Sequence, residues 1–363
     1  MIRFDTVSKK YGKVYAVQEV SFEVEKGEFC CLLGPSGCGK STTLKMINRL
    51  VEPTSGTITF QEKDIKTVRP ELLRRQIGYV IQNVGLFPHM TVQENIGVVP
   101  GLLGWSRDKS RTRGRELLEL FGLNPDGYGG KYPDELSGGE AQRVGVARAL
   151  AADPDVLLMD EPFGALDPLT RTRLQSEFAK IQRELGKTIL FVTHDIDEAV
   201  HLASQIALMH EGRLVQFDTP ETLLSHPKNR FVRQFIGSDR ALKKLSRQYV
   251  SSVVQPARSI SSDTPPEIIE EEMRKQAALC PHPFLWVVTR EGIVIGWVDG
   301  TDSTSPLQDS MNPVDPADFP LRKNLSLKQA LTHFLRHGVE CLPVVDDTLR
   351  LIGELHIKDL LAE

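Results

Sequence analysis

The sequence has no apolar run long enough to cross a membrane, few cysteines and little net charge. Its longest apolar stretch, 95–105, is broken by Pro100 and falls short of the ~18 residues that a spanning helix needs. The five cysteines form no CxxC pair and no sequential His/Cys pattern of zinc spacing, which excludes a disulfide scaffold and a zinc ribbon. A net charge of −4 from 44 basic and 48 acidic residues argues against a protein that binds the nucleic-acid backbone.

The remaining composition is that of an ordinary folded protein. Hydrophobic residues make up 40% and charged residues 25% of the 363 positions, and this length fits about two domains. The first residues, Met1-Ile-Arg-Phe, lack the basic and apolar segments of a secretory signal. We therefore expect a soluble, cytosolic chain with reduced thiols, and a separate protein must supply any membrane span.

The chain divides by pattern into two parts and a connection. Residues 1–236 alternate short apolar runs, such as 29–33, 156–159 and 188–192, with helical patterns, which predicts an α/β domain. The polar, basic stretch 237–249 is interpreted as a linker. Residues 250–363 contain two similar units, about 250–303 and 307–361, whose apolar segments align at an offset of 57 residues. Such a repeat predicts two copies of one small α/β unit packed together.

The segment Gly34 to Ser41, GPSGCGKS, matches the phosphate-loop pattern GxxxxGK[ST] between a predicted strand and a predicted helix. Its glycines allow backbone N–H groups to surround phosphate oxygens, and the helix N-terminus adds positive potential. Lys40 is predicted to reach the β and γ phosphates and Ser41 to bind Mg²⁺.

A second acidic element ends a buried strand at Asp160 and Glu161. Because the carboxyl ends of parallel strands meet at one edge of a sheet, Asp160 is expected to hold Mg²⁺ near the phosphate loop, and Glu161 to act as a general base. A solvated Asp-Glu turn is the alternative. His194 ends another apolar strand, but on residue pattern alone it would be a surface or core histidine.

Together these motifs resemble the nucleotide-binding subunits of ABC (ATP-binding cassette) transporters over residues 1–235. Leu136-Ser-Gly-Gly-Glu140 matches the family signature, with Glu140 where many members have glutamine. The resemblance implies a mixed-sheet ATPase core with a helical subdomain. It also implies catalytic roles for Glu161, His194 and Gln82, and metal binding by Ser41, Gln82 and Asp160. The implied nucleotide-binding residues are Tyr11, Gly34, Pro35, Ser36, Gly37, Cys38, Gly39, Lys40, Ser41, Thr42, Ser137, Gly138, Gly139 and Asp167.

The resemblance further implies the cofactors and partners. Two copies would bind two ATP molecules with Mg²⁺, each between the Lys40 loop of one chain and the Ser137 motif of the other. The segment 87–90 would dock integral membrane permease subunits, although a core-facing loop is the alternative there. An extracytoplasmic substrate-binding protein would act indirectly, no nucleic acid is expected, and the chain would lie peripherally on the cytoplasmic face of the inner membrane.

Within the family, segments 45–56 and 85–105 are most similar to importers of quaternary-amine osmoprotectants such as glycine betaine, carnitine and choline. Importers of polar amino acids, soluble ABC ATPases acting on nucleic acid, and small-molecule kinases with a phosphate loop are the alternatives. The tail resembles tandem cystathionine-β-synthase-type (CBS) modules, a small α/β fold. His356 and Asp299 stand where ribose-binding CBS units usually have Thr or Ser, which favours a dimer-forming tail over a nucleotide sensor. Two further roles for the tail stay open: binding of a cyclic dinucleotide, and a response to ionic strength.

Overall fold

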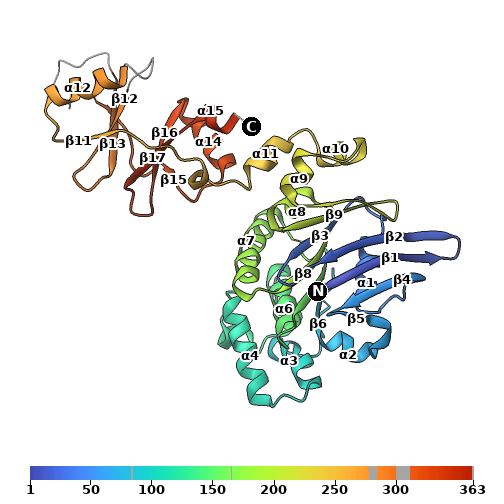
Figure 1. Ribbon diagram of the computed structural model, residues 1–363. Helices are drawn as coiled ribbons and strands as arrows, with labels where there is room; N and C mark the ends of the chain where they lie inside the picture. The colour runs from blue at the N-terminus through green and yellow to red at the C-terminus, as the bar shows by residue number, and fades with distance from the viewer. Residues whose placement is uncertain (83–84, 165, 278–283, 300–310, 362–363) are drawn as a thin grey trace. The chain divides into compact units, whose positions relative to one another are not determined.

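The computed structural model describes residues 1–363 except 83–84, 165, 278–283, 300–310 and 362–363. These residues form two compact units, Met1–Ser238 and Asp239–Glu363 (Figure 1). The boundary between the two expected repeats, about residues 303–307, lies outside the described residues. Among the described residues, no helix combines the length and the apolar character that crossing a membrane requires.

The first unit is built on a six-stranded mixed sheet in the order β10-β9-β3-β8-β7-β6. Only the β9–β10 pairing is antiparallel, so β3, β6, β7, β8 and β9 all end at the same edge. The strands are β3 (Phe29–Leu33), β6 (Ile77–Val80), β7 (Val156–Asp160), β8 (Thr188–Thr193), β9 (Gln205–His210) and β10 (Arg213–Asp218). Because β3, β7 and β8 are buried along their whole length, they require apolar residues at nearly every position.

A second, antiparallel sheet of order β2-β1-β4-β5 belongs to the same unit. It consists of β1 (Ile2–Tyr11), β2 (Val14–Val24), β4 (Ser55–Phe60) and β5 (Lys63–Asp64). One buried cluster joins this sheet to the helix α1 (Lys40–Ile47) and to the central sheet, through residues that include Phe4, Leu44 and Val192. The helix that follows the phosphate loop is therefore held between the two sheets.

Helices complete the first unit. The mutually packed helices α3 (Val92–Leu102), α4 (Arg107–Leu120) and α6 (Gly138–Leu150) form a helical group. The others are α2 (Pro70–Arg75), α5 (Pro125–Tyr128), α7 (Pro168–Leu185), α8 (Ile196–Leu202), α9 (Pro220–Ser225) and α10 (Arg230–Ile236), with 3₁₀ turns η1 (Ile65–Thr67) and η2 (Pro133–Glu135). A mixed sheet with a group of helices confirms the predicted fold class for this part.

The second unit holds two small sheets, of order β11-β12-β13-β14 and β15-β16-β17. Its strands are β11 (Ser259–Ser261), β12 (Phe284–Val288), β13 (Val294–Asp299), β14 (Asn312–Pro313), β15 (Leu321–Arg322), β16 (Cys341–Val345) and β17 (Leu351–His356). Its helical segments are α11 (Arg240–Leu245), η3 (Val250–Ser252), α12 (Pro266–Ala277), α14 (Leu327–His337) and α15 (Ile357–Leu361).

The offset of 57 residues recurs in the pairing of the strands. Phe284 pairs with Asp299 in the hairpin β12–β13, and Cys341 pairs with His356 in β16–β17, with an irregularity at the equivalent point of each hairpin. The two hairpins meet at a bridge between Ile293 and Arg350, themselves 57 residues apart. Trp286, Val294 and Val345 share one buried cluster there, so the two repeats bury their apolar faces against each other.

The expected linker, 237–249, contains helix α11. Leu245 lies in the same buried cluster as Leu327 and Phe334, and Lys243 forms an ion pair of 2.9 Å with Asp239. Part of the polar stretch that suggested a linker is thus a short helix packed on the tail, in which Lys243 is buried beside Leu245. The domain boundaries given from the sequence stay a prediction.

Candidate nucleotide site

The phosphate-loop segment connects β3 to α1 and has positive φ angles at Gly34, Gly37 and Gly39. A Cβ atom on Gly34 would lie 2.2 Å from the carbonyl oxygen of Met209, and one on Gly39 would lie 2.3 Å from that of Ala16. Both positions therefore require glycine for space as well as for conformation. The loop is pressed against β9 and β2, and its shape is built into the core.

Lys40 is buried at the end of this loop. Its Nζ donates hydrogen bonds to the carbonyl oxygens of Gly34, at 2.7 Å, and Pro35, at 3.0 Å. Gly39 caps α1 without a side-chain hydrogen bond, so no side chain caps the first N–H groups of the helix. An ammonium group and helix N–H donors in one small loop suit a polyanion. Ser36 and Gly37 are exposed on the loop, Cys38 is buried, and Thr42 is half-buried in α1.

Ser41 and Asp160 come together as the sequence predicted. The Ser41 hydroxyl donates to Oδ1 of Asp160 at 2.9 Å. Burial raises the pKa of Asp160 above its ordinary value, and the hydrogen bond from Ser41 acts in the opposite direction. A hydroxyl and a carboxylate beside a phosphate loop are the oxygen donors that Mg²⁺ prefers, so these residues fit that ion.

Glu161 is the meeting point of the three residues expected to act in catalysis. Nε2 of Gln82 donates to Oε2 of Glu161 at 3.5 Å, and Nδ1 of His194 lies 3.3 Å from Oε1. Glu161 has a φ of +45°, and its N–H donates to the carbonyl of Val192 at 3.1 Å. The left-handed backbone turns this side chain away from the strand direction at the sheet edge, toward the exposed side chains of Gln82 and His194.

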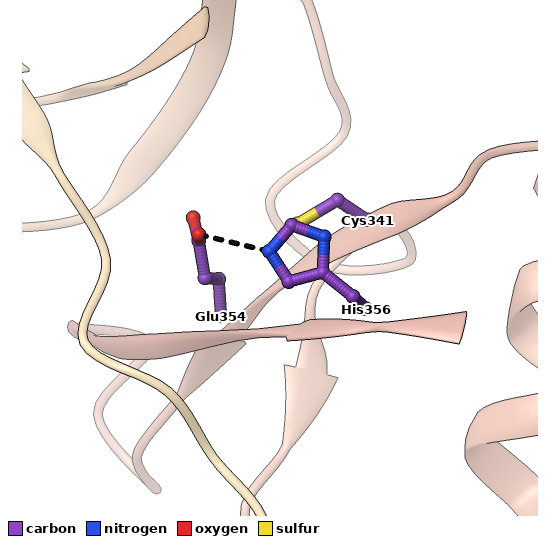
Figure 2. Close-up of side chains that lie close together, drawn as sticks. All are labelled: Cys341, Glu354 and His356. Atoms are coloured by element: carbon purple, nitrogen blue, oxygen red, sulfur yellow. Dashed lines mark hydrogen bonds and ion pairs between the residues drawn. The ribbon is translucent and has the colours of Figure 1, made fainter. Parts of the chain in front are cut away.

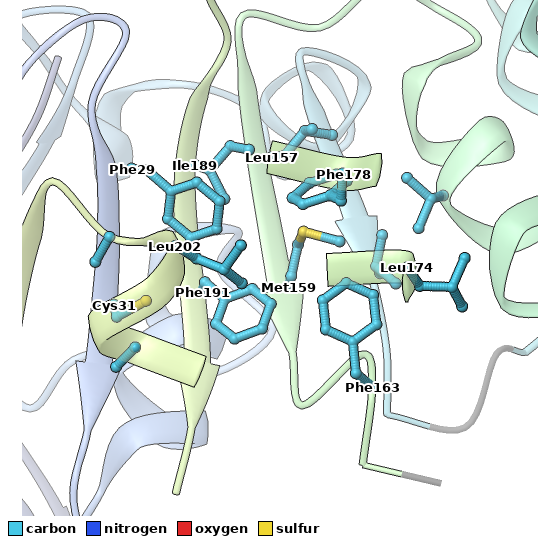
Figure 3. Close-up of a cluster of buried hydrophobic side chains, with 14 of the residues drawn as sticks. Phe29, Cys31, Leu157, Met159, Phe163, Leu174, Phe178, Ile189, Phe191 and Leu202 are labelled. Carbon is cyan, nitrogen blue, oxygen red and sulfur yellow. The ribbon is translucent and has the colours of Figure 1, made fainter. Parts of the chain in front are cut away.

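An apolar cluster anchors the segment after Glu161. Figure 3 shows Phe163, two residues further on, packed among Met159, Phe178 and Phe191. Phe163 is 3% exposed, and its ring centre lies 6.2 Å from that of Phe178 and 5.8 Å from that of Phe191. Burial of such an aromatic side chain contributes about 2–3 kcal/mol. The apolar contacts of Phe163 therefore hold the segment that carries Glu161 in place.

The signature residues lie at the start of another helix. Ser137 caps α6, and its hydroxyl and N–H both donate to Oε2 of Glu140 at 2.8 Å. The hydroxyl of Tyr128 donates to Oε1 of Glu140 at 2.6 Å. These hydrogen bonds, that of Tyr128 first, lower the pKa of Glu140 to about 2. Gly138 and Gly139 are the first residues of α6, and the methyl group of Thr170 lies close to Gly139.

Two further predicted residues lie apart from this group. Asp167 caps α7, where its Oδ1 accepts a hydrogen bond from the N–H of Thr170 at 3.1 Å. Tyr11 ends β1 with half its surface exposed, and the ammonium of Lys9 lies 5.0 Å from its ring centre. An exposed aromatic ring of this kind is free to stack on a planar base.

Glu198 is a buried carboxyl group on the helix that follows His194, and it was not among the residues expected from the sequence. Glu198 accepts a hydrogen bond from Gln175 at 2.9 Å and another from the hydroxyl of Thr193. The N–H of Asp195 in turn donates to the Thr193 hydroxyl at 3.0 Å. Burial raises the pKa of Glu198. This network fixes the turn that carries His194, and the spacing Asp195-x-x-Glu198 at the start of α8 was its only signal.

Comparison with known proteins places this geometry in a family. The ABC transporter family model matches residues 17–164, and the CBS domain model matches residues 315–363. The carnitine transport ATP-binding protein OpuCA of Listeria monocytogenes is 45% identical, over 97% of this chain and 89% of its own length. The chain belongs to the ABC transporter family. Membership makes it an ATP-binding subunit whose ATPase activity is coupled to transport, with a CBS domain in its tail.

Other proteins similar to this ABC subunit are named for the transport of related compounds. The glycine betaine/carnitine/choline transport ATP-binding protein OpuCA of Bacillus subtilis is 45% identical over 97% of this chain and 93% of its own length. The glycine betaine uptake system ATP-binding protein YehX of Escherichia coli is 43% identical over the full length of both. Among solved structures, the ATP-binding cassette MJ0796, a dimer bound to ADP and Pi, is 32% identical to this chain. The match covers 60% of this chain and 98% of the MJ0796 chain, with a TM-score of 0.55.

Proposed function

We propose that this chain hydrolyses ATP to drive the import of a quaternary-amine osmoprotectant, of the glycine betaine, carnitine and choline class. The observation that carries the ATPase part is the convergence of Glu161, Gln82 and His194 beside the Ser41–Asp160 pair at one sheet edge. The names of relatives at 41–45% identity support the cargo class. They do not favour amino-acid import or a soluble ATPase on nucleic acid.

In this proposal the phosphates of ATP bind between the loop glycines, Lys40 and the first turn of α1. Lys40 exchanges its carbonyl partners for the β and γ phosphates. Ser41, Asp160 and Gln82 would hold Mg²⁺, which neutralises phosphate charge when bound. The adenine ring stacks on Tyr11. The remaining proposed nucleotide contacts come from Gly34, Pro35, Ser36, Gly37, Cys38, Gly39, Thr42, Ser137, Gly138, Gly139 and Asp167.

Hydrolysis then uses the carboxylate of Glu161. It accepts a proton from water as the water oxygen bonds to the γ-phosphorus and the bond to the β-phosphate oxygen breaks, releasing ADP and phosphate. Gln82 and His194, each within hydrogen-bonding reach of Glu161, orient the carboxylate and the water. His194 is 62% exposed and Glu161 21%, so the water can enter from the His194 side.

Two copies complete the site. We infer a head-to-tail pair in which the N-terminus of α6 of one chain, capped by Ser137, faces the γ-phosphate held by Lys40 of the other. A helix of this length with glycines in its first turn provides N–H donors and a positive terminus for an anion. ATP would then favour the closed pair because it contacts both chains, and hydrolysis would reopen it.

The permease is proposed to dock at a groove of about 350 Å³ lined by Tyr79, Phe87, Val98 and Arg148, among others. Phe87 is 40% exposed, but its backbone is fixed by hydrogen bonds to the side chain of Asn95, at 2.7 and 3.1 Å. Nη1 of Arg148 donates to the carbonyl of Gly85 at 2.7 Å. The exposed ring of Phe87, on a backbone held by hydrogen bonds at the edge of the groove, suits the apolar face of a partner helix. Gln82 precedes Phe87 by only a few positions in the sequence, so docking at this edge can be sensed at the ATP site.

For the tail we propose a regulatory or dimerising module, residues 250–363, after an ATPase domain of residues 1–236 and a connection at 237–249. A nucleotide ligand is a weaker option, because the Asp299 carboxylate would repel a phosphate there. The substrate-binding protein would act on the far side of the membrane, and this chain would work peripherally at the cytoplasmic face of the inner membrane.

Uptake of labelled substrates tests the cargo. Cells carrying this chain, its Lys40→Ala form or the surface control Lys63→Ala would be grown at high osmolarity and given glycine betaine, choline or histidine. We expect Lys40→Ala to abolish betaine or choline uptake and Lys63→Ala to preserve it. Loss of histidine uptake alone would move the cargo to amino acids, and unchanged uptake of betaine and choline would leave the ABC ATPase standing but reject the cargo assignment.

A further inference from the structure

Three side chains with metal-binding atoms meet on one face of the hairpin β16–β17. Figure 2 shows Cys341, Glu354 and His356 with their functional groups turned toward one another. Cys341 and His356 are direct partners in the antiparallel register, and Glu354 precedes His356 by two residues on the same strand. Residues so related point to the same face of a sheet. One ligand atom from each lies within 4.8 Å of the others.

The two separations that involve His356 are close to those around a tetrahedral ion, and the third, between Cys341 and Glu354, is within 4.8 Å. Nε2 of His356 lies 3.8 Å from Sγ of Cys341 and 3.1 Å from Oε1 of Glu354. Zinc bonds of about 2.0–2.1 Å to nitrogen or oxygen and about 2.3 Å to sulfur, at tetrahedral angles, separate the ligand atoms by about 3.3–3.6 Å. Small shifts of the side chains would therefore complete three bonds, with no change in the register of the strands.

The carboxylate of Glu354 is already oriented by a residue of the first repeat. Nε1 of Trp286, which is 2% exposed, donates to Oε2 of Glu354 at 2.9 Å, so that Oε1 faces His356. The backbone of Glu354 exchanges two hydrogen bonds of 2.8 Å with Gln255. Hydrogen bonds that fix a ligand from behind are typical of metal sites. Trp286 is thus a positioning residue.

The equivalent hairpin of the first repeat lacks this set of donors. At the offset of 57 residues, Phe284 replaces Cys341, Trp297 replaces Glu354 and Asp299 replaces His356. Since β12–β13 forms the same pairing with two aromatic residues at these positions, the fold of the hairpin does not require a thiol, a carboxylate and an imidazole. Packing of the two repeats therefore does not explain why the second repeat has Cys341, Glu354 and His356 at these positions.

We propose that Cys341, Glu354 and His356 bind one Zn²⁺ per chain, with a fourth position open to water. A thiolate, an imidazole and a carboxylate form a donor set that suits zinc, whereas Mg²⁺ and Ca²⁺ prefer oxygen alone. All three side chains are half-buried, so the ion can reach them from solvent. Burial raises the pKa of the Cys341 thiol, and zinc would displace that proton to solvent.

Cobalt and zinc titrations of the metal-free full-length chain test the site. We expect one equivalent of Co²⁺ to produce a thiolate-to-cobalt charge-transfer band, and Zn²⁺ to abolish it. Cys341→Ser should remove the band, while Cys38→Ala, which removes a buried thiol of the phosphate loop, should keep it. Absence of the band in the wild type, or its survival in Cys341→Ser, would overturn the proposal.

Zinc affinity measured against a chromophoric chelator separates ligands from packing. Trp286→Phe keeps an aromatic side chain, though a smaller one, and loses the donor to Glu354. We expect it to weaken zinc binding about 10-fold, as loss of an outer partner does. Loss of a ligand in His356→Gln should weaken it further, and His333→Gln in α14 should not change it. Equal affinity in the wild type and His356→Gln would overturn the site, even if Cys341→Ser failed to fold.

Discussion

Nδ1 of His194 lies 3.3 Å from Oε1 of Glu161, at the ends of two neighbouring parallel strands. Replacement of His194 by Gln should leave ATP binding nearly unchanged, because the phosphate loop is intact. Hydrolysis should fall about 100-fold, the loss expected when the reacting groups are no longer held in the right geometry. Turnover and nucleotide affinity would be measured side by side. His201→Gln, on the exposed side of α8, is the control, and equal losses in both variants would refute a specific role.

The pKa of Asp160 predicts opposite effects on stability and activity. Because burial raises the pKa of this carboxyl in the folded state, the folded chain binds more protons than the unfolded chain just above pH 3.8, and stability falls as pH rises through that window. At neutral pH, therefore, the ionised carboxylate of Asp160 destabilises the folded chain when no Mg²⁺ is bound. Asp160→Asn should raise the melting temperature of the ligand-free chain and abolish Mg²⁺-dependent hydrolysis.

Asp155→Asn, at the exposed start of the same strand, provides the control for this pair of effects. Its carboxylate accepts a hydrogen bond from Gln61 at 3.0 Å and faces solvent. We expect neither stabilisation nor loss of hydrolysis in that variant. A lower melting temperature in Asp160→Asn would contradict the account of the buried carboxylate.

Glu140 predicts the reverse dependence on pH. Its pKa is lowered from 4.5 to about 2, so the carboxylate adds stability that is present above pH 4.5 and is lost as pH falls toward 2. Glu140→Gln should lower the free energy of unfolding at pH 6 and bring the variant and wild type together near pH 2. Urea unfolding at several pH values measures this difference. A constant difference across the range would show that the charge of Glu140 is not involved.

The phosphate loop allows a matched comparison of two glycines. Gly37 and Gly34 both have positive φ, but a Cβ on Gly37 would meet no atom within 4 Å, whereas one on Gly34 would overlap Met209. Gly37→Ala should cost about 1–2 kcal/mol of stability for the left-handed backbone alone. Gly34→Ala should cost clearly more. Chemical denaturation without nucleotide measures both, and equal costs would contradict the tight contact with Met209.

Much of the site could be predicted because its residues follow buried strands. Asp160 was expected beside the phosphate loop of Ser41 from the rule that parallel strands end at one edge. His194 received its role only from the family resemblance, and the structure places all three residues at that edge. Contacts made by packing were not predictable. Tyr128 reaches Glu140 from a separate helix, and Glu198 reaches Thr193 beneath the sheet edge. Neither pair leaves a periodic signal in the sequence.

The tail shows the same limit more sharply. The cysteines have no sequential zinc spacing, yet Cys341 meets His356 through the register of a hairpin and Glu354 through the alternation of side chains. These atoms are brought together by the pairing of the strands β16 and β17. The sequence repeat did not predict which residues of the two strands pair. Helix α11 was likewise hidden, because only Leu245 of its short span is an apolar residue packed in the core.

Glu161→Gln tests the central claim most directly, because glutamine keeps the size of the side chain and removes the base. The purified chain and its variant would be mixed with ATP and Mg²⁺, and phosphate release and mass in solution would be recorded together. The account predicts that the variant loses hydrolysis about 100-fold or more and accumulates as an ATP-bound pair of chains. Normal turnover by the variant, or a monomer that holds ATP, would contradict it.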